Sequence, residues 1–242
     1  MKALFLMAFS LVLLLSGCVE KSGNLTNEYA ANESKIYKDV FVVRGKRIPL
    51  PPGEWRIAVS GLNAEKFFIV YLVKGYNTKN FDYIRISIDS LELQREFGYK
   101  VSEEPKRKDL HSSVVNKNVA SEAQDWWIVN NRIMNYTPKA DDLLSNQMVE
   151  YFKSHNYITS HDMVYAEHFL SGEHPFKHRH LSVTYNYSPE AEGFAPGEKG
   201  TWATSEWNAV RIHEDKRKAD FVKELIEKHK AIHAQLQAGF HK

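Results

Sequence analysis

The sequence predicts an α+β fold: a mainly antiparallel sheet with one inserted helix and a long C-terminal helix packed on it. Several segments alternate apolar and polar residues with period two, as strands with one wet face do. Helical spacing occurs in one internal segment and again at the end of the chain. A strand-rich order with an inserted and a terminal helix favours the α+β class.

The composition is that of a globular protein. The 242 residues are 43% hydrophobic and 26% charged, and the formal net charge is +2. These fractions exclude wholesale disorder. A chain so close to neutral lacks the basic excess that gathers phosphates, so we expect no nucleic-acid partner.

Residues 1–17 read as a secretory signal peptide. Lys2 supplies a positive start, and Ala3 to Leu15 is a 13-residue apolar stretch broken only by Ser10. Thirteen helical residues span about 20 Å, which is too short to cross a hydrocarbon core of ~30 Å. The pattern therefore predicts a cleaved leader rather than a transmembrane helix.

The end of this leader, Leu15-Ser16-Gly17-Cys18, resembles the lipobox of bacterial lipoproteins. The resemblance implies a diacylglycerol thioether on Cys18, cleavage before it and acylation of the new amino group, with a membrane as partner. Cys18 is the only cysteine, so an intramolecular disulfide is excluded. Val19 follows it where an Asp would resemble an inner-membrane retention signal of Gram-negative lipoproteins. We therefore expect the outer membrane, on its periplasmic side.

The remainder divides into a tether and one domain. Residues 18–34 hold the lipidated cysteine and a polar stretch without apolar period, which predicts a flexible linker. Residues 35–242 contain neither a repeat nor a Gly/Ser linker, so we expect a single globular domain.

The strands are predicted by alternation. Three segments each place alternate apolar residues on one expected buried face: Trp55, Ile57 and Val59; Ile84, Ile86 and Ile88; Leu181, Val183, Tyr185 and Tyr187. Phe67 to Val73 is apolar throughout, which indicates a central strand covered on both faces. Trp126 and Trp127 are neighbours, so one indole should be core and the other a candidate contact surface or covered by a loop.

Two helices follow from 3.6-residue spacing. In residues 141–154, the stripe is Leu144, Met148, Tyr151 and Phe152. In residues 214–238, it is Phe221, Leu225, His229, Ile232 and Leu236. Gly239 stands where a C-terminal stop belongs.

Histidines are the candidate metal ligands. If residues 161–170 and 179–187 form a hairpin that pairs Tyr165 with Val183, then His168 lies opposite His180, with Cβ atoms ~5 Å apart. Such imidazoles, with His178 one pleat along, can hold a divalent ion. The alternative is a polar outer face of a hairpin.

His229 and His233 have the i, i+4 spacing of zinc-binding helices. Lys230 stands where a metalloprotease has its glutamate, and His229 lies on the apolar stripe, so a satisfied core histidine is the alternative. We expect no cofactor. No nucleophile motif is present, and no catalytic residue is assigned.

Three further motifs carry a second resemblance. Ile48 to Trp55 reads IPLPPGEW, Val183 to Glu190 reads VTYNYSPE, and Trp202, Ser205 and Trp207 follow. Together they resemble an uncharacterised domain of secreted proteobacterial proteins and lipoproteins. Ser188 stands where that domain usually has Asn, and Glu206 where it has Asp. The resemblance supports one domain and implies no activity.

We therefore expect a lipid-anchored cell-envelope protein that acts as a non-catalytic binding or interaction module in the periplasm. An envelope protein or peptidoglycan is the candidate partner. The alternative is a histidine-dependent, metal-binding envelope enzyme of hydrolase type. Convergence of the histidines in a cleft would distinguish the two.

Overall fold

The computed structural model describes residues 28–32, 34–63, 67–75, 79–89, 110–117, 124–134, 143–158, 160–174, 177–197 and 200–240. The leader and Cys18 lie outside these residues. None of the described helices has the length and apolar character needed to cross a membrane.

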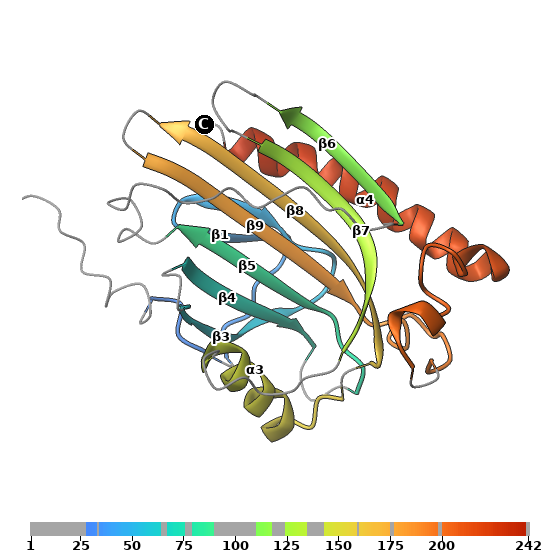
Figure 1. The fold of residues 1–242 in the computed structure, drawn as a ribbon. Helices are drawn as coiled ribbons and strands as arrows, with labels where there is room; N and C mark the ends of the chain where they lie inside the picture. The colour runs from blue at the N-terminus through green and yellow to red at the C-terminus, as the bar shows by residue number, and fades with distance from the viewer. Residues whose placement is uncertain are drawn as a thin grey trace, which may run out of the picture.

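One seven-stranded antiparallel sheet dominates the fold, in the order β3-β4-β5-β9-β8-β7-β6 (Figure 1). A separate hairpin, β1-β2, and the helices α3 and α4 pack around it. The α+β prediction is confirmed. The strands are β1 (Val40–Val43), β2 (Lys46–Pro49), β3 (Trp55–Leu62), β4 (Phe67–Lys74), β5 (Tyr83–Asp89), β6 (His111–Lys117), β7 (Gln124–Ile133), β8 (Asp162–His174) and β9 (Lys177–Tyr187). The helices are α3 (Leu143–Ser154), α4 (Lys216–Phe240) and the short η2 (Trp202–Thr204) and η3 (Ile212–Glu214).

The larger core lies on the sheet face that α4 and the β1-β2 hairpin cover. Ile84, Ile86 and Ile88 are buried there together, as their alternation predicts. The helix contributes the stripe that its spacing predicts, with Phe221 only partly buried at its edge. Burial of an aliphatic side chain contributes about 1.5–3 kcal/mol. This face therefore supplies most of the apolar burial of the described fold.

The second face carries a smaller core under α3. Leu144, Met148 and Phe152 point from the helix into it, and Tyr151 is partly buried. Residues of β4 alternate between the two cores, with Phe68 in the larger one and Ile69 in the smaller one. The prediction of a central strand covered on both faces is confirmed.

Val59 departs from the expected face because β3 contains a bulge between Ile57 and Val59. An inserted residue reverses the alternation, so Trp55 and Ile57 enter the larger core and Val59 the smaller one. Gly239 is also not a stop, since α4 continues to Phe240, whose ring is buried. A Cβ at Gly239 would meet no atom within 4 Å.

Neither indole of the Trp pair is exposed. Trp127 packs in the larger core, while Trp126 on the opposite face stacks on Phe169 at a centroid distance of 5.2 Å. Their exposed fractions are 3% and 4%. The expectation of opposite faces is confirmed, but an exposed indole is wrong because both faces are covered at this place.

Candidate functional site

The β8-β9 hairpin sets which histidines meet. It pairs His168 with Val183 and Ser171 with His180, a shift of three residues from the expected pairing of Tyr165 with Val183. A shift by an odd number of residues changes which side chains of β8 lie on the same face as a given side chain of β9. His168 therefore points toward α4 and His180 points away from it, and the predicted juxtaposition of these two is wrong. The strands run up to His174 and Lys177, which makes the connection tighter than the loop we expected.

His168 instead meets the two histidines of α4. Its Nε2 lies 2.9 Å from Nδ1 of His229, and its Nδ1 lies 3.1 Å from Nδ1 of His233. The hydroxyl of Tyr187 lies 2.8 Å from Nε2 of His229. Tyr187, His229, His168 and His233 thus form one continuous chain of hydrogen bonds, which we call the histidine chain.

The histidine chain is fully inside the larger core. His168 and His229 have no exposed surface, and His233 is 2% exposed. Burial lowers the pKa of His168 well below its usual range, that of His229 to about 3 and that of His233 to about 4. The three imidazoles are therefore neutral. Each carries one N–H, so one proton is available for every contact along the chain.

This geometry differs from that of a metal centre. The two nitrogens of His168 lie on opposite edges of its ring and face different partners, so the three rings do not aim at one point. No group of three His, Cys, Asp or Glu side chains in the described part of the chain is placed to hold a metal ion. The arrangement is that of a hydrogen-bonded core network.

The opposite face of the sheet is polar at its centre. The row Arg85, Thr184 and Glu167 crosses three neighbouring strands as direct pairs. One pleat along, Asn186 pairs with Tyr165. We expected the polar side of β9 to be wet, yet Thr184 and Asn186 are only 3% and 1% exposed. Buried polar side chains of this kind require partners or a ligand.

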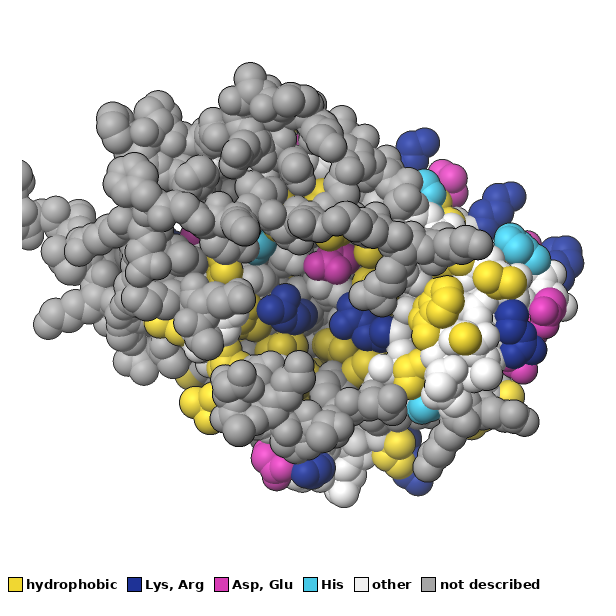
Figure 2. All heavy atoms as spheres, in the orientation of Figure 1, with side chains coloured by type: hydrophobic (Ala, Val, Ile, Leu, Met, Phe, Trp, Pro, Cys, Tyr) yellow, Lys and Arg dark blue, Asp and Glu magenta, His cyan; other side chains and the backbone are white. Residues whose placement is uncertain are grey.

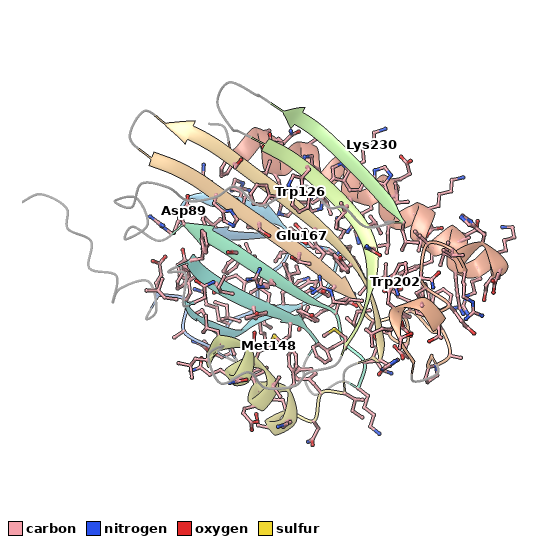
Figure 3. The ribbon with its side chains drawn as sticks, in the orientation of Figure 1. Asp89, Trp126, Met148, Glu167, Trp202 and Lys230 are labelled. Carbon is pink, nitrogen blue, oxygen red and sulfur yellow. The ribbon has the colours of Figure 1, made fainter. Side chains whose placement is uncertain are left out.

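Figure 2 shows this face with Lys or Arg and Asp or Glu side chains inside a hollowed region over the middle of the sheet. Figure 3 shows Trp126 on β7 and Glu167 on β8, which register places on this same face. We call the site the polar hollow and define it by six side chains: Arg85, Trp126, Arg132, Glu167, Thr184 and Asn186.

The polar hollow contains groups whose hydrogen-bonding capacity is unused. Within the described residues, the guanidinium of partly buried Arg85 has neither a hydrogen bond nor an ion pair. Arg132 stacks on the ring of Tyr165 at 3.9 Å, and its buried Nε has no partner. The same holds for Trp126 Nε1 and Asn186 Oδ1.

Glu167 and His180 complete the polar side of this face. Glu167 accepts one hydrogen bond, from Ser182 at 3.3 Å. The His180 ring packs against Phe67 and Phe169. Its pKa is lowered to about 3, chiefly by burial and further by the nearby charge of Arg85, so the ring is neutral. The side chain of His178 lies outside the described part of the structure.

A third polar cluster surrounds Ser205 and explains part of the Trp-rich motif. Ser205 Oγ donates to Asp162 at 2.6 Å and accepts from the Asn131 amide and the Trp207 backbone. The neighbouring His161 accepts from the Gly200 N–H instead of contacting the serine. The cluster ties the segment after β9 to the sheet and lacks the serine–histidine contact of a nucleophile.

Sequence reasoning missed the polar hollow. Arg85 and Asn186 each read as the wet side of an alternating strand, and Glu167 was not singled out. The one available signal was Arg85 between Ile84 and Ile86 in a short strand, where a cation has few neighbours to pair with. Comparison of the chain with protein-family models, curated proteins and solved structures gives no significant match.

Proposed function

We propose that this chain is a lipid-anchored protein of the cell envelope, held at the outer membrane and facing the periplasm. In this proposal it is a non-catalytic binding module, and the polar hollow is its ligand site. The lipobox-like sequence before Cys18 supports the anchor. Tyr29 is already buried in the larger core against Phe41 and Phe68, so in this proposal the tether ends before Tyr29 and is shorter than the expected residues 18–34.

The unpartnered guanidinium of Arg85 carries the assignment of a ligand site. Arg85 is partly buried, and a cation that loses part of its hydration without gaining a partner carries a cost that functional sites tolerate. The neighbouring Arg132 has no hydrogen bond among the described residues either. A bound anion would supply what both arginines lack.

Binding rather than catalysis is favoured by what surrounds the polar hollow. Its one hydroxyl–carboxylate contact, Ser182 to Glu167, is long at 3.3 Å. The neutral ring of His180 lies between aromatic side chains. Catalysis by general base and nucleophile needs a close, aligned pair, and the described residues of this face offer none.

The anchor is tested in a Gram-negative host by palmitate labelling and membrane fractionation of the full chain. We expect labelled protein in the outer-membrane fraction, and Cys18→Ser should abolish the label and release the protein from the membrane. Unchanged fractionation of Cys18→Ser would refute the anchor. Native mass spectrometry of the extracted protein then tests binding, since a retained small molecule is expected in the wild type and not in Arg85→Gln.

The alternative, a metal-dependent envelope enzyme, rests on three buried histidines, of which His168 lies within 3.1 Å of both His229 and His233. Elemental analysis of purified protein decides it. We expect no stoichiometric zinc, because the histidine chain does not converge on one point. One zinc per chain that disappears in His168→Gln would establish the alternative instead.

A further inference from the structure

We propose that the polar hollow binds an elongated organic molecule with two acidic groups, one held by Arg85 and the other by Arg132. This inference rests on the polar hollow being the ligand site, as proposed above, and it names the chemical class of the ligand. The acidic groups are carboxylates or groups of similar shape and charge.

The register of the sheet places the two arginines at opposite ends of a diagonal. Arg85 lies on β5 and Arg132 on β7, with Asn186 of β9 and Tyr165 of β8 between them as a direct pair. Three strand spacings across and four residues along give about 20 Å between the arginine Cα atoms on a flat sheet. A ligand that contacts both arginine side chains must therefore be elongated.

The two guanidinium groups are suited to acid groups. A guanidinium presents five N–H donors in a planar fork that matches two oxygens of a carboxylate. Arg132 uses its flat face to stack on Tyr165, which holds the plane while the N–H groups around its edge stay available. Arg85 forms no ion pair with a carboxylate among the described residues.

The middle of the diagonal excludes a third acid group. Glu167 is an acceptor with one long hydrogen bond, and Asn186 has an unused carbonyl oxygen. Both oxygens can accept a hydrogen bond from an N–H or O–H group of the ligand. The complementary molecule therefore carries acid groups at its ends and an amine, amide or hydroxyl between them.

The test uses the full-length acylated protein in detergent micelles and a series of straight-chain dicarboxylates with four to ten carbons. Monocarboxylates of the same lengths are the reference compounds. Binding is followed by calorimetry and by fluorescence, because the Trp126 indole lies in the site. We expect an optimum length at which the dicarboxylate binds at least tenfold more tightly than the matching monocarboxylate.

Two variants assign the ends of the ligand. Arg85→Gln and Arg132→Gln should each remove the tenfold advantage of the second acid group. Arg47→Gln is the matched control, because it removes the same charge from an exposed position of β2 on the other side of the sheet. It should leave binding unchanged. Circular dichroism at each step confirms that the variants are folded.

Glu167→Gln tests the middle. The substitution removes a negative charge, so unsubstituted dicarboxylates should bind more tightly. An amino-substituted dicarboxylate of the same length should lose its preference over the unsubstituted compound. A structural role for Glu167 alone would not reverse the order of the two ligands.

Binding that ignores the second acid group, or that persists in folded Arg85→Gln and Arg132→Gln proteins, overturns the inference. If no dicarboxylate binds but another molecule co-purifies in an Arg85-dependent way, the ligand class is wrong and the binding module stands. If nothing binds and nothing co-purifies, both fall.

Discussion

Mild acid is expected to unfold this protein through its buried histidines. His168, His229 and His233 are neutral in the larger core, and His180 is neutral on the opposite face. The ordinary pKa of a histidine in the unfolded chain is 6.5. As pH falls below that value, the histidines of the unfolded chain bind protons, whereas those buried in the folded chain do not. Stability is therefore complete above pH 6.5 and is lost progressively toward the folded pKa values of about 3 to 4.

The magnitude follows from the size of these shifts. Each histidine that stays neutral in the folded protein lowers the free energy of unfolding by about 1.4 kcal/mol per pH unit below 6.5. At pH 5 this amounts to about 2 kcal/mol for one histidine and about 6 kcal/mol for His180, His229 and His233 together. His168 acts in the same direction. A domain of ordinary stability has 5–15 kcal/mol in total, so unfolding is expected between about pH 5.5 and 4.

Neighbouring charges alter this effect without reversing it. Asp125 raises the pKa of His233, whereas Lys228 lowers that of His229 and Arg85 lowers that of His180. In each case burial is the larger cause. Burial also raises the pKa of the Asp162 carboxyl from 3.8. That group gains a proton more readily in the folded state and stabilises it as pH falls, which opposes the effect of the histidines.

The assay is urea unfolding at a series of pH values from 7.5 to 5, followed by circular dichroism. The free energy of unfolding should be level above pH 7 and then fall with a limiting slope of about 4–5.5 kcal/mol per pH unit. His168→Gln should reduce that slope by about 1.4 kcal/mol per pH unit. The slope is diagnostic even where the variant is less stable overall.

His213→Gln provides the control, because His213 is exposed on η3. It should leave the slope unchanged. A wild-type slope of about 1.4 kcal/mol per pH unit or less between pH 6 and 5, which corresponds to one proton, would refute the reasoning. It would mean that the histidines are charged or accessible in the folded protein.

Three further substitutions test the packing. Met148→Ala removes a buried side chain of α3 and should lower the free energy of unfolding by about 2–5 kcal/mol, measured by urea denaturation. Ser205→Ala removes the 2.6 Å hydrogen bond to the buried Asp162 carboxyl, so a loss of about 1–3 kcal/mol in the free energy of unfolding is expected. An unchanged free energy of unfolding would show that the cluster has no structural role. Gly239→Ala lies within α4 in open space, and thermal unfolding should show a neutral or stabilising change of up to about 1 kcal/mol.

Regular periodicity predicted the elements well where one face of a strand or helix is apolar. Ile84, Ile86 and Ile88 share a core because side chains two apart on a strand point the same way. The buried stripe of α4 follows from helical spacing in the same manner. Local bulges escape such reasoning, and the one in β3 sent Val59 to the other core.

The register of the β8-β9 hairpin could not be predicted from the pattern of apolar and polar residues. Met163, Val164, Tyr165 and Ala166 are all buried, so β8 carries no alternation that could distinguish one pairing from the next. The candidate site depended on that register. A shift of three residues separated His168 from His180 and brought His168 to the histidines of α4.

By itself, the sequence determined the α+β class, several of the core strands, both long helices and the i, i+4 pair of histidines on the last helix, because these depend on local periodicity. Only the tertiary structure decided that His229 and His233 meet His168. It also decided that Arg85 and Arg132 share one face of the sheet without carboxylate partners among the described residues. Such meetings depend on register and on which layers cover each face of the sheet. Both are set by contacts between residues far apart in the chain, and no local pattern encodes them.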